Sequence, residues 1–519
     1  MTKRYIRFFF YITLIFFGLF LGSIITKSIF KTNPPYILIN NDTKIENVLN
    51  LIESHYVDSI DTKKITTKVI NSILDKLDPH SEYIDAEKFI TIEENMQGSF
   101  SGIGVQFNII NDSIVVIAPI SGGPSKKLGI RSGDRIIEVE GENVASINIR
   151  NEGVIKRLRG EKGSAVNIKV FRPNYHQIID FKIIRDDIPL YSVDAAIMMT
   201  NDIGYIKVNR FSATTFEEFI KGADKLLNNG MKKLILDLRG NPGGYLNMAI
   251  NIADAILDKG QLIVYTQGRN RERTNIYSTS QGILQKTKVI VLIDEGSASA
   301  SEIVSGAIQD NDRGTLIGRR SFGKGLVQEQ ISLTDGSVIR LTTQRYYTPS
   351  GRCIQKEYGE SKEEYYLESL MRNKKEKVND SLIFTTKNGR LVYGGGGITP
   401  DIIINTDSTL NYSKINLMIA EGWLSEFCLQ HSLSLKKEHL NTTQTQFINT
   451  NADDIYPFFL QFIKEKNTDL VIDFGNKELS YLKILLKATV ARNIWDDEIY
   501  FKILNTNDEF IQTAINSFK

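Results

Sequence analysis

Apolar residues near the amino end of the chain form one long uninterrupted run. Residues 8–25 contain no charged side chain, and three basic residues precede them. A run of this length can cross a bilayer, and basic residues before it favour an amino terminus in the cytoplasm. We therefore expect a cytoplasmic segment over residues 1–7 and a transmembrane anchor over residues 8–26, with a cleaved signal peptide as the alternative. Either way, the bulk of the chain is expected in the periplasm or another extracytoplasmic space, beyond a single-pass anchor in the inner (cytoplasmic) membrane.

The next two regions differ in the period of their apolar residues. In the region 40–90, apolar side chains recur at helical spacing between Lys44 and Leu77, which predicts two helices, the second stopped by Asp78-Pro79. Residues 91–187 carry short β runs separated by glycine turns, with one helical stretch at residues 151–160. This texture predicts a small strand-rich module.

Residues 188–406 alternate between apolar strands and amphipathic helices. Strands are predicted at 203–208, 232–239 and 288–294, helices at 216–230, 246–257 and 299–310, and a further strand at 337–349. Near-continuous apolar strands that alternate with helices indicate a mostly parallel sheet. Residues 407–519 are more polar and helical in pattern, so they form a helical extension. The predicted fold class is multidomain, α/β and β.

Composition narrows the function only by exclusion. The 519 residues leave room for roughly three or four domains. A net charge of +2 does not point to nucleic acid as a partner. Two cysteines, Cys353 and Cys428, are too few for a disulfide framework or a zinc site, and whether they pair is left open. We expect no metal and no cofactor.

Ser299 stands in the turn SASASE, between a predicted buried strand and a predicted helix. The start of a helix offers free backbone N–H groups and a positive dipole end, both suited to a developing oxyanion. The small neighbours Ala298 and Ala300 would let a peptide approach closely. The alternative is that serines here only cap the helix, which is the role expected of Ser297 and Ser301.

Lys324 is the candidate base for this serine. The histidines at positions 55, 80, 176, 431 and 439 fall in other modules, and a lysine can replace histidine in Ser–Lys variants. Its pKa must then fall from ~10.4 to ~7–8, which burial can achieve. Lys324 is flanked by glycines and followed by Leu326 and Val327, which could exclude water. An ordinary surface lysine is the alternative, and an NTPase is rejected because Gly325 stands where a phosphate loop needs a hydroxyl.

A glycine-rich loop, DLRGNPGG at residues 237–244, directly follows another predicted buried strand. Glycines at the carboxyl end of a strand can turn backbone N–H groups into a cleft, and sites in α/β sheets gather at that edge. A plain turn is the alternative, since N-P-G-G is a strong turn signal.

Together these segments resemble the C-terminal (tail-specific) processing proteases of peptidase family S41, over most of residues 44–405. The resemblance implies that Ser299 is the nucleophile, Lys324 the general base and Gln328 the residue that orients the lysine. It also implies oxyanion-hole amides from Ala300 and from a glycine of the NPGG loop, for which we predict Gly243 and keep Gly244 as the alternative. The segments 77–83 and 394–401 also look like family segments, without an assigned catalytic role.

The strand-rich module resembles a PDZ domain, which this family inserts before its protease core. The loop Gly102-Ile103-Gly104-Val105 matches the PDZ carboxylate-binding loop, whose amides hold a peptide terminus while the peptide adds as a strand. Arg159 is expected to couple peptide capture to an active arrangement.

The expected function is therefore a serine endopeptidase with a Ser–Lys dyad that cleaves near the unstructured C-terminal tails of exported proteins. The alternative is a catalytically inactive PDZ adaptor on a protease-like fold. Expected partners are peptide or protein substrates and the membrane, and a homo-oligomer is left open. The helical extension is expected to pack on the N-terminal helices or to form a dimer.

Overall fold

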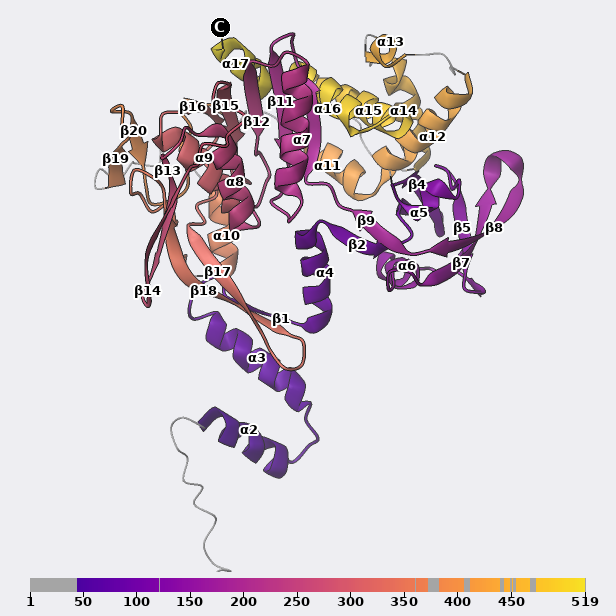
Figure 1. The fold of residues 1–519 in the computed structure, drawn as a ribbon. Helices are drawn as coiled ribbons and strands as arrows, with labels where there is room; N and C mark the ends of the chain where they lie inside the picture. The colour runs from indigo at the N-terminus through magenta and orange to yellow at the C-terminus, as the bar shows by residue number, and fades with distance from the viewer. Residues whose placement is uncertain are drawn as a thin grey trace, which may run out of the picture. The chain divides into compact units, whose positions relative to one another are not determined.

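The computed structural model describes residues 44–120, 122–359, 361–371, 382–405, 411–438, 443–448, 450, 454–466 and 473–518 (Figure 1). Contacts divide the chain into two units, residues 1–76 and 77–519. The predicted cytoplasmic segment (1–7) and anchor (8–26) lie outside the described residues. Among the described helices, none combines the length and the apolar character that a bilayer crossing requires.

The first unit contains the two predicted helices. They are α2 (Lys44–His55) and α3 (Thr62–Leu74). Asp61 caps α3 by accepting a hydrogen bond from the Lys64 amide, and the helix ends at Leu74, a few residues before Asp78-Pro79. The apolar period therefore predicted both helices correctly.

The second unit contains helix α4 (Ala86–Gln97), which the apolar pattern did not predict, and the strand-rich module follows this helix. The module's sheet runs in the order β3-β4-β5-β7-β8, with β6 beside β5, and every pairing in it is antiparallel. Its strands are β3 (Val105–Ile110), β4 (Ser113–Pro119), β5 (Arg135–Val139), β6 (Glu142–Asn143), β7 (Ala165–Arg172) and β8 (Gln177–Ile184), and its helices are α5 (Pro124–Lys127) and α6 (Asn151–Leu158). The entering strand β2 (Ser99–Gly102) pairs with the leaving strand β9 (Asp186–Pro189), so the module is closed where the chain enters and leaves it.

The α/β region contains the predicted mostly parallel sheet. Its order is β10-β11-β12-β15-β16-β21, and only β10 pairs antiparallel. The strands are β10 (Val193–Met198), β11 (Ile203–Val208), β12 (Lys233–Asp237), β15 (Lys288–Ile293), β16 (Gly314–Gly318) and β21 (Ile402–Ile403). Loops that follow β12, β15 and β16 therefore leave the same edge of the sheet side by side.

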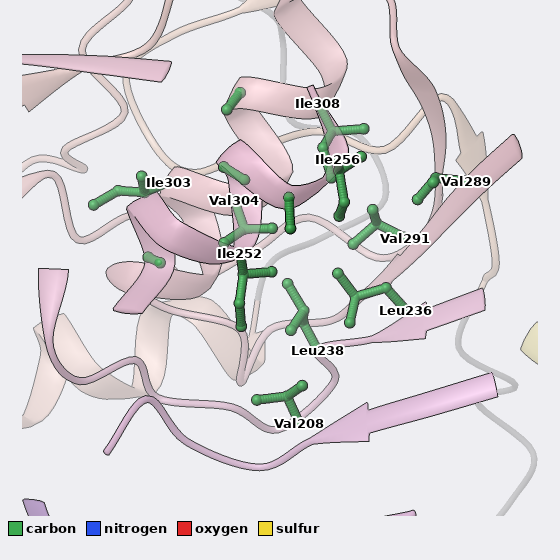
Figure 2. Close-up of a cluster of buried hydrophobic side chains, with 14 of the residues drawn as sticks. Val208, Leu236, Leu238, Ile252, Ile256, Val289, Val291, Ile303, Val304 and Ile308 are labelled. Carbon is green, nitrogen blue, oxygen red and sulfur yellow. The ribbon is translucent and has the colours of Figure 1, made fainter. Parts of the chain in front are cut away.

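Both faces of this sheet are covered, which explains why its strands are apolar almost throughout. Helices α7 (Thr215–Asn228), α8 (Leu246–Ile256) and α9 (Ala300–Asp310) pack on one face. Figure 2 shows this core, in which Leu236 and Val291 of the sheet meet Ile252 and Val304 of the helices. On the other face, Ile235, Ile290, Leu292 and Ile317 contact Phe510, Ile511 and Ala514 of helix α17 (Glu509–Ser517).

A second, antiparallel sheet is built from strands that lie far apart in the sequence. It pairs β1 (Glu82–Ile84), β18 (Val338–Tyr347), β13 (Leu262–Gly268) and β14 (Arg271–Tyr277), and β17 (Leu326–Ser332) pairs with β18. Of these strands, β18 corresponds to the strand predicted at residues 337–349. The remaining elements of this region are helix α10 (Lys362–Met371) and the pair β19 (Ile383–Thr385) and β20 (Leu391–Tyr393).

The extension after residue 407 is helical, as predicted. Its helices before α17 are α11 (Ser413–Ala420), α12 (Trp423–Glu438), α13 (Gln444–Ile448), α14 (Tyr456–Lys466), α15 (Asn476–Ile494) and α16 (Asp497–Leu504). They share a core that includes Cys428, and both Cys428 and Cys353 are free thiols. The packing of α17 on the α/β sheet was not among the two packings expected for this extension, because nothing in the local pattern says which distant surface an apolar helix face will cover.

Because the middle of the sheet is buried on both faces and its edge is exposed, the same Ile→Ala substitution should lower the free energy of unfolding by different amounts at the two places. Ile290 on β15 is 3% exposed, whereas Ile403 on β21, at the sheet edge, is 60% exposed. We expect Ile290→Ala to lower the free energy of unfolding by about 2–5 kcal/mol, and Ile403→Ala to change it by less than about 0.5 kcal/mol. Urea titration of both variants measures the difference, and equal losses would contradict two-sided burial.

Candidate active site

Three loops at the carboxyl edge of the parallel sheet bring the predicted nucleophile, base and oxyanion-hole segments together. Ser299 follows β15, Lys324 follows β16, and the NPGG loop follows β12. Ser299, Ala300, Lys324, Gln328 and Gly244 line one cleft of about 720 Å³. The predicted peptide-binding loop 102–105 and Arg159 do not line it. Of the predicted pair of glycines, only Gly244 does.

Ser299 is the residue immediately before helix α9, and its backbone is strained. It has φ 54° and ψ −110°, a combination that non-glycine residues rarely adopt. Such strain costs about 1–3 kcal/mol and persists only where neighbouring contacts impose it. Here the Ser299 amide donates to Glu302 Oε2 at 2.8 Å. The strained turn presents Ser299 to the cleft.

The neighbouring serines do not cap the helix as predicted. Ser297 Oγ donates to the Leu238 carbonyl at 2.8 Å, and Ser301 Oγ donates to the Asn241 carbonyl at 2.9 Å. Both acceptors belong to the chain just after β12. The two hydroxyls therefore bind the turn around Ser299 to the loop after β12. The capping prediction was wrong because it took account only of neighbours in the sequence.

Lys324 is held by the amide of Gln328. Lys324 Nζ donates to Gln328 Oε1 at 2.8 Å, and Gln328 Nε2 donates to the His80 carbonyl at 2.7 Å. Burial lowers the pKa of Lys324 to about 8, with the positive charge of Arg340 acting in the same direction. Within the described residues no hydrogen bond joins Ser299 Oγ to Lys324 Nζ. Catalytic hydrogen bonds commonly tighten only when substrate is bound.

His80 lies closer to this lysine than its position in the sequence suggested. Its carbonyl holds Gln328, while its Nε2 is 2.8 Å from the hydroxyl of Tyr365. Burial and the nearby charge of Lys324 lower the pKa of His80 to about 3, so its ring is neutral at physiological pH. Its ring bonds neither Ser299 nor Lys324, and segment 77–83 thus supports the site through its backbone.

Gly244 fits an oxyanion donor better than the predicted Gly243. The Gly243 amide already donates to Asn241 Oδ1 at 2.9 Å. Within the described residues the amides of Gly244 and Ala300 donate to no protein acceptor, and both residues line the cleft. Gly244 has φ 147°, and a Cβ there would lie 2.1 Å from the Phe211 carbonyl oxygen. Only glycine fits at this position, so the NPGG loop can follow this path along the wall of the cleft.

Two residues missed at the sequence level hold Ser299 and Lys324 relative to each other. Glu302 is fully buried, and its Oε2 accepts the amides of both Ser299 (2.8 Å) and Lys324 (2.9 Å). The Tyr346 hydroxyl contacts the carbonyl oxygens of the same two residues, at 3.0 and 2.6 Å. We call this pair the Glu302–Tyr346 clamp. The capping-box spacing S-x-x-E could have found the first contact of Glu302, but no local signal marks Tyr346.

The predicted peptide-binding loop forms the junction of β2 and β3. Gly104 has φ 74° and its carbonyl accepts the Ile120 amide, while Ile103 is buried in the module core. Arg159 forms an ion pair with Glu94 of α4 and lies 4.3 Å from the ring centroid of Phe100. Arg159 therefore connects the strand-rich module to α4. Within the described residues no group of three or more metal-ligating side chains forms.

Comparisons with known proteins show which family and which domains the chain resembles. The model of peptidase family S41 matches residues 202–361, and the PDZ domain model matches residues 101–183. A carboxy-terminal-processing protease of Bartonella bacilliformis is 38% identical over 345 residues, which is 65% of this chain and 78% of that protein. The carboxy-terminal processing protease CtpB of Bacillus subtilis is 35% identical over 316 residues, 60% of this chain and 65% of that protein. Among solved structures, the photosystem II D1 C-terminal processing protease has 23% identity and a TM-score of 0.37, and the match covers 71% of this chain and 94% of that one.

The Glu302–Tyr346 clamp predicts that the hydroxyl of Tyr346 contributes more to the free energy of unfolding than the hydroxyl of Tyr347, its neighbour on β18. Tyr346→Phe removes a buried donor and leaves two carbonyls without it, so we expect a loss of about 1–3 kcal/mol in the free energy of unfolding. Tyr347→Phe is the matched control, because within the described residues the Tyr347 hydroxyl makes no hydrogen bond and its ring stacks on Tyr265. Urea titration compares the two, and the clamp is contradicted if both variants lose the same stability.

Proposed function

This chain belongs to the carboxy-terminal processing serine proteases of peptidase family S41, with a PDZ domain, and we propose that it works through a Ser–Lys dyad of Ser299 and Lys324. One observation carries the proposal: Ser299 lines the same cleft as a lysine whose pKa burial lowers to about 8. A lysine with that pKa is partly neutral near pH 7 and can accept a proton. A serine hydroxyl attacks poorly without such a base.

The proposed reaction begins with proton transfer. Neutral Lys324 Nζ takes the proton of Ser299 Oγ as that oxygen attacks the scissile carbonyl carbon. The negative charge that develops on the carbonyl oxygen is stabilised by the amides of Gly244 and Ala300. Lys324 then gives its proton to the leaving amine, and the peptide bond breaks to leave an acyl-enzyme. Water, with Lys324 again as base, attacks the ester and releases the acid product.

Gln328 orients the base in this scheme. Because its Nε2 is committed to the His80 carbonyl, its Oε1 must face Lys324 Nζ. The lysine is then held by one acceptor and keeps a direction toward the cleft. A neutral amide partner also suits a lysine that must lose its charge, since a carboxylate at this position would raise the pKa.

The PDZ domain supplies the proposed substrate class, proteins and peptides with unstructured C-termini. Amides of loop 102–105 would hold the terminal carboxylate while the peptide adds along β3. Arg159, paired with Glu94 of α4, is proposed to report this capture to the cleft, because Ile92 and Met96 of the same helix line it. Unchanged peptide-stimulated activity in Arg159→Ala would argue against that role.

Export of the enzyme is proposed from the sequence alone. The uncharged apolar run over residues 8–25, preceded by basic residues, supports a single-pass anchor in the cytoplasmic membrane with the bulk of the chain outside the cytoplasm. The inactive-adaptor alternative is not favoured, since an adaptor has no need of a buried lysine beside a strained serine.

Removal of either dyad member tests the proposal directly. We expect Ser299→Ala and Lys324→Ala each to lower kcat on a disordered peptide with an apolar C-terminus by about 10³-fold or more. Lys286→Ala, which removes an exposed lysine outside the cleft, should keep wild-type cleavage. Circular dichroism establishes that the variants are folded. Full activity in either variant would contradict the assignment of Ser299 and Lys324 as the catalytic dyad.

The pH dependence of cleavage tests the role of Lys324 as a base. Only the neutral amine accepts a proton, so kcat/KM should rise with pH through an apparent pKa near 8. Arg340→Met removes a neighbouring positive charge and leaves Glu82 without its ion-pair partner, and both changes favour the charged lysine. The midpoint should therefore move to higher pH in Arg340→Met but not in the exposed control Arg271→Met. A midpoint that stays or falls would contradict the assignment of this titration to Lys324.

A further inference from the structure

Two arginines from the active-site loops lie against one aromatic ring of the C-terminal extension. Arg239 belongs to the loop after β12 that contains Gly244, and Arg319 to the loop after β16 that contains Lys324. Their guanidinium carbons lie 4.6 and 5.1 Å from the ring centroid of Phe510, near the start of α17. Phe510 is 9% exposed. A single side chain thus contacts the loops of both the proposed oxyanion donor and the proposed base.

Asp508 adds a polar connection at the same place. Its Oδ1 accepts the amides of Phe510 and Ile511 and so caps α17. Its Oδ2 accepts Arg239 Nη1 at 2.8 Å. The Nε and Nη2 atoms of Arg239 bind Asp237, the buried last residue of β12. The start of α17 is therefore bonded to the loop that carries Gly244.

The nucleophile loop joins this arrangement through Arg319. Arg319 Nε donates to Glu295 Oε2 at 2.7 Å, and its amide donates to the Ile293 carbonyl at 3.0 Å. Ile293 is the last residue of β15, and Glu295 lies on the turn that leads from β15 to Ser299. The ring of Phe510 also leaves no spare room beside the base loop, because a Cβ at Gly318 would lie 3.0 Å from Phe510 Cε1. Movement of Phe510 would thus shift the loops after β12, β15 and β16.

We propose that the start of α17 is a positioning element for the reaction, in which Phe510 and Asp508 hold the loops of Gly244, Ser299 and Lys324 at their catalytic spacing. The proposal rests on the proposed function of those three loops. Both residues act through Arg239 and Arg319 and contact no reacting atom. A displacement of about 1 Å in a catalytic group can cost on the order of 100-fold in rate, so loss of this support should be visible in kcat.

The test uses the full chain with two variants and one matched control. Phe510→Ala removes the ring, while Asp508→Asn removes the charge that binds Arg239 and keeps a good helix cap. Phe518→Ala is the control: this ring lies at the other end of α17, 6.0 Å from Nζ of Lys233, the first residue of β12. Two readouts are measured, the kinetics of peptide cleavage and the hydrogen exchange of amides in residues 238–245, 294–300 and 319–325.

We expect kcat to fall on the order of 10- to 100-fold in Phe510→Ala and by a smaller factor in Asp508→Asn, with KM within about twofold of wild type. Amides of the three loops should exchange faster in both variants. Phe518→Ala should show neither change. A purely structural role for α17 would instead lower activity equally in Phe510→Ala and Phe518→Ala.

The proposal is overturned if Phe510→Ala and Asp508→Asn are folded with wild-type kcat and loop exchange, or if Phe518→Ala matches them in both readouts. Should Phe510→Ala fail to fold, Asp508→Asn decides, because it preserves the cap and the packing of α17. Failure of the proposed function has a different signature: the wild-type chain itself would not cleave, or Ser299→Ala would cleave equally well. The exchange measurement still decides the positioning role in that case.

Discussion

The carboxylate of Glu302 sits where no water reaches it and is surrounded by donors. It accepts the amides of Ser299, Gly323 and Lys324 and the hydroxyl of Ser321. Ser321 Oγ itself accepts the Ile398 amide, so its proton is directed at Glu302. Burial raises the pKa of Glu302, and the hydrogen bonds oppose that rise. The three backbone amides and the hydroxyl that donate to this carboxylate favour its ionised form.

Much of the site geometry follows from this one group. The amides of Ser299 and Lys324 both donate to Glu302 Oε2, so this one oxygen fixes the distance between the two backbones. The Ser299 amide reaches that oxygen from a backbone with the strained φ of 54°. Tyr346 closes the same arrangement from the carbonyl side. The backbones of Ser299 and Lys324 are thus held on both their amide and their carbonyl sides.

Elements with a strong local period were predictable, and so was the edge of the sheet where the site lies. The runs 203–208, 232–239 and 288–294 read as buried parallel strands because they are apolar on both faces, and they form β11, β12 and β15. Ser299 and the NPGG loop could be placed at that edge because each follows a predicted buried strand. Lys324 and Gln328 were assigned through the family resemblance, since β16 was not predicted. By contrast, β1 pairs with β18 across more than half of the described chain, and short strands with distant partners carry no local signal. The choice between Gly243 and Gly244 depended on which amide the Asn241 side chain accepts, and the nearness of His80 depended on the same long-range pairing of β1.

The packing of α17 on the parallel sheet also has a consequence for the order of folding. Every strand of that sheet precedes α17 in the sequence, and the strands expose apolar side chains on that face until the helix arrives. Contacts between segments this far apart form late in folding, since the chain must first pay the entropy of closing a long loop. While the polypeptide is still being made, the loops after β12, β15 and β16 therefore lack the contacts that α17 supplies. A chain that has not yet packed α17 onto the sheet contains Ser299, Lys324 and Gly244 but lacks the contacts of Asp508 and Phe510 with their loops. Docking of α17 is therefore the folding step that completes the active site.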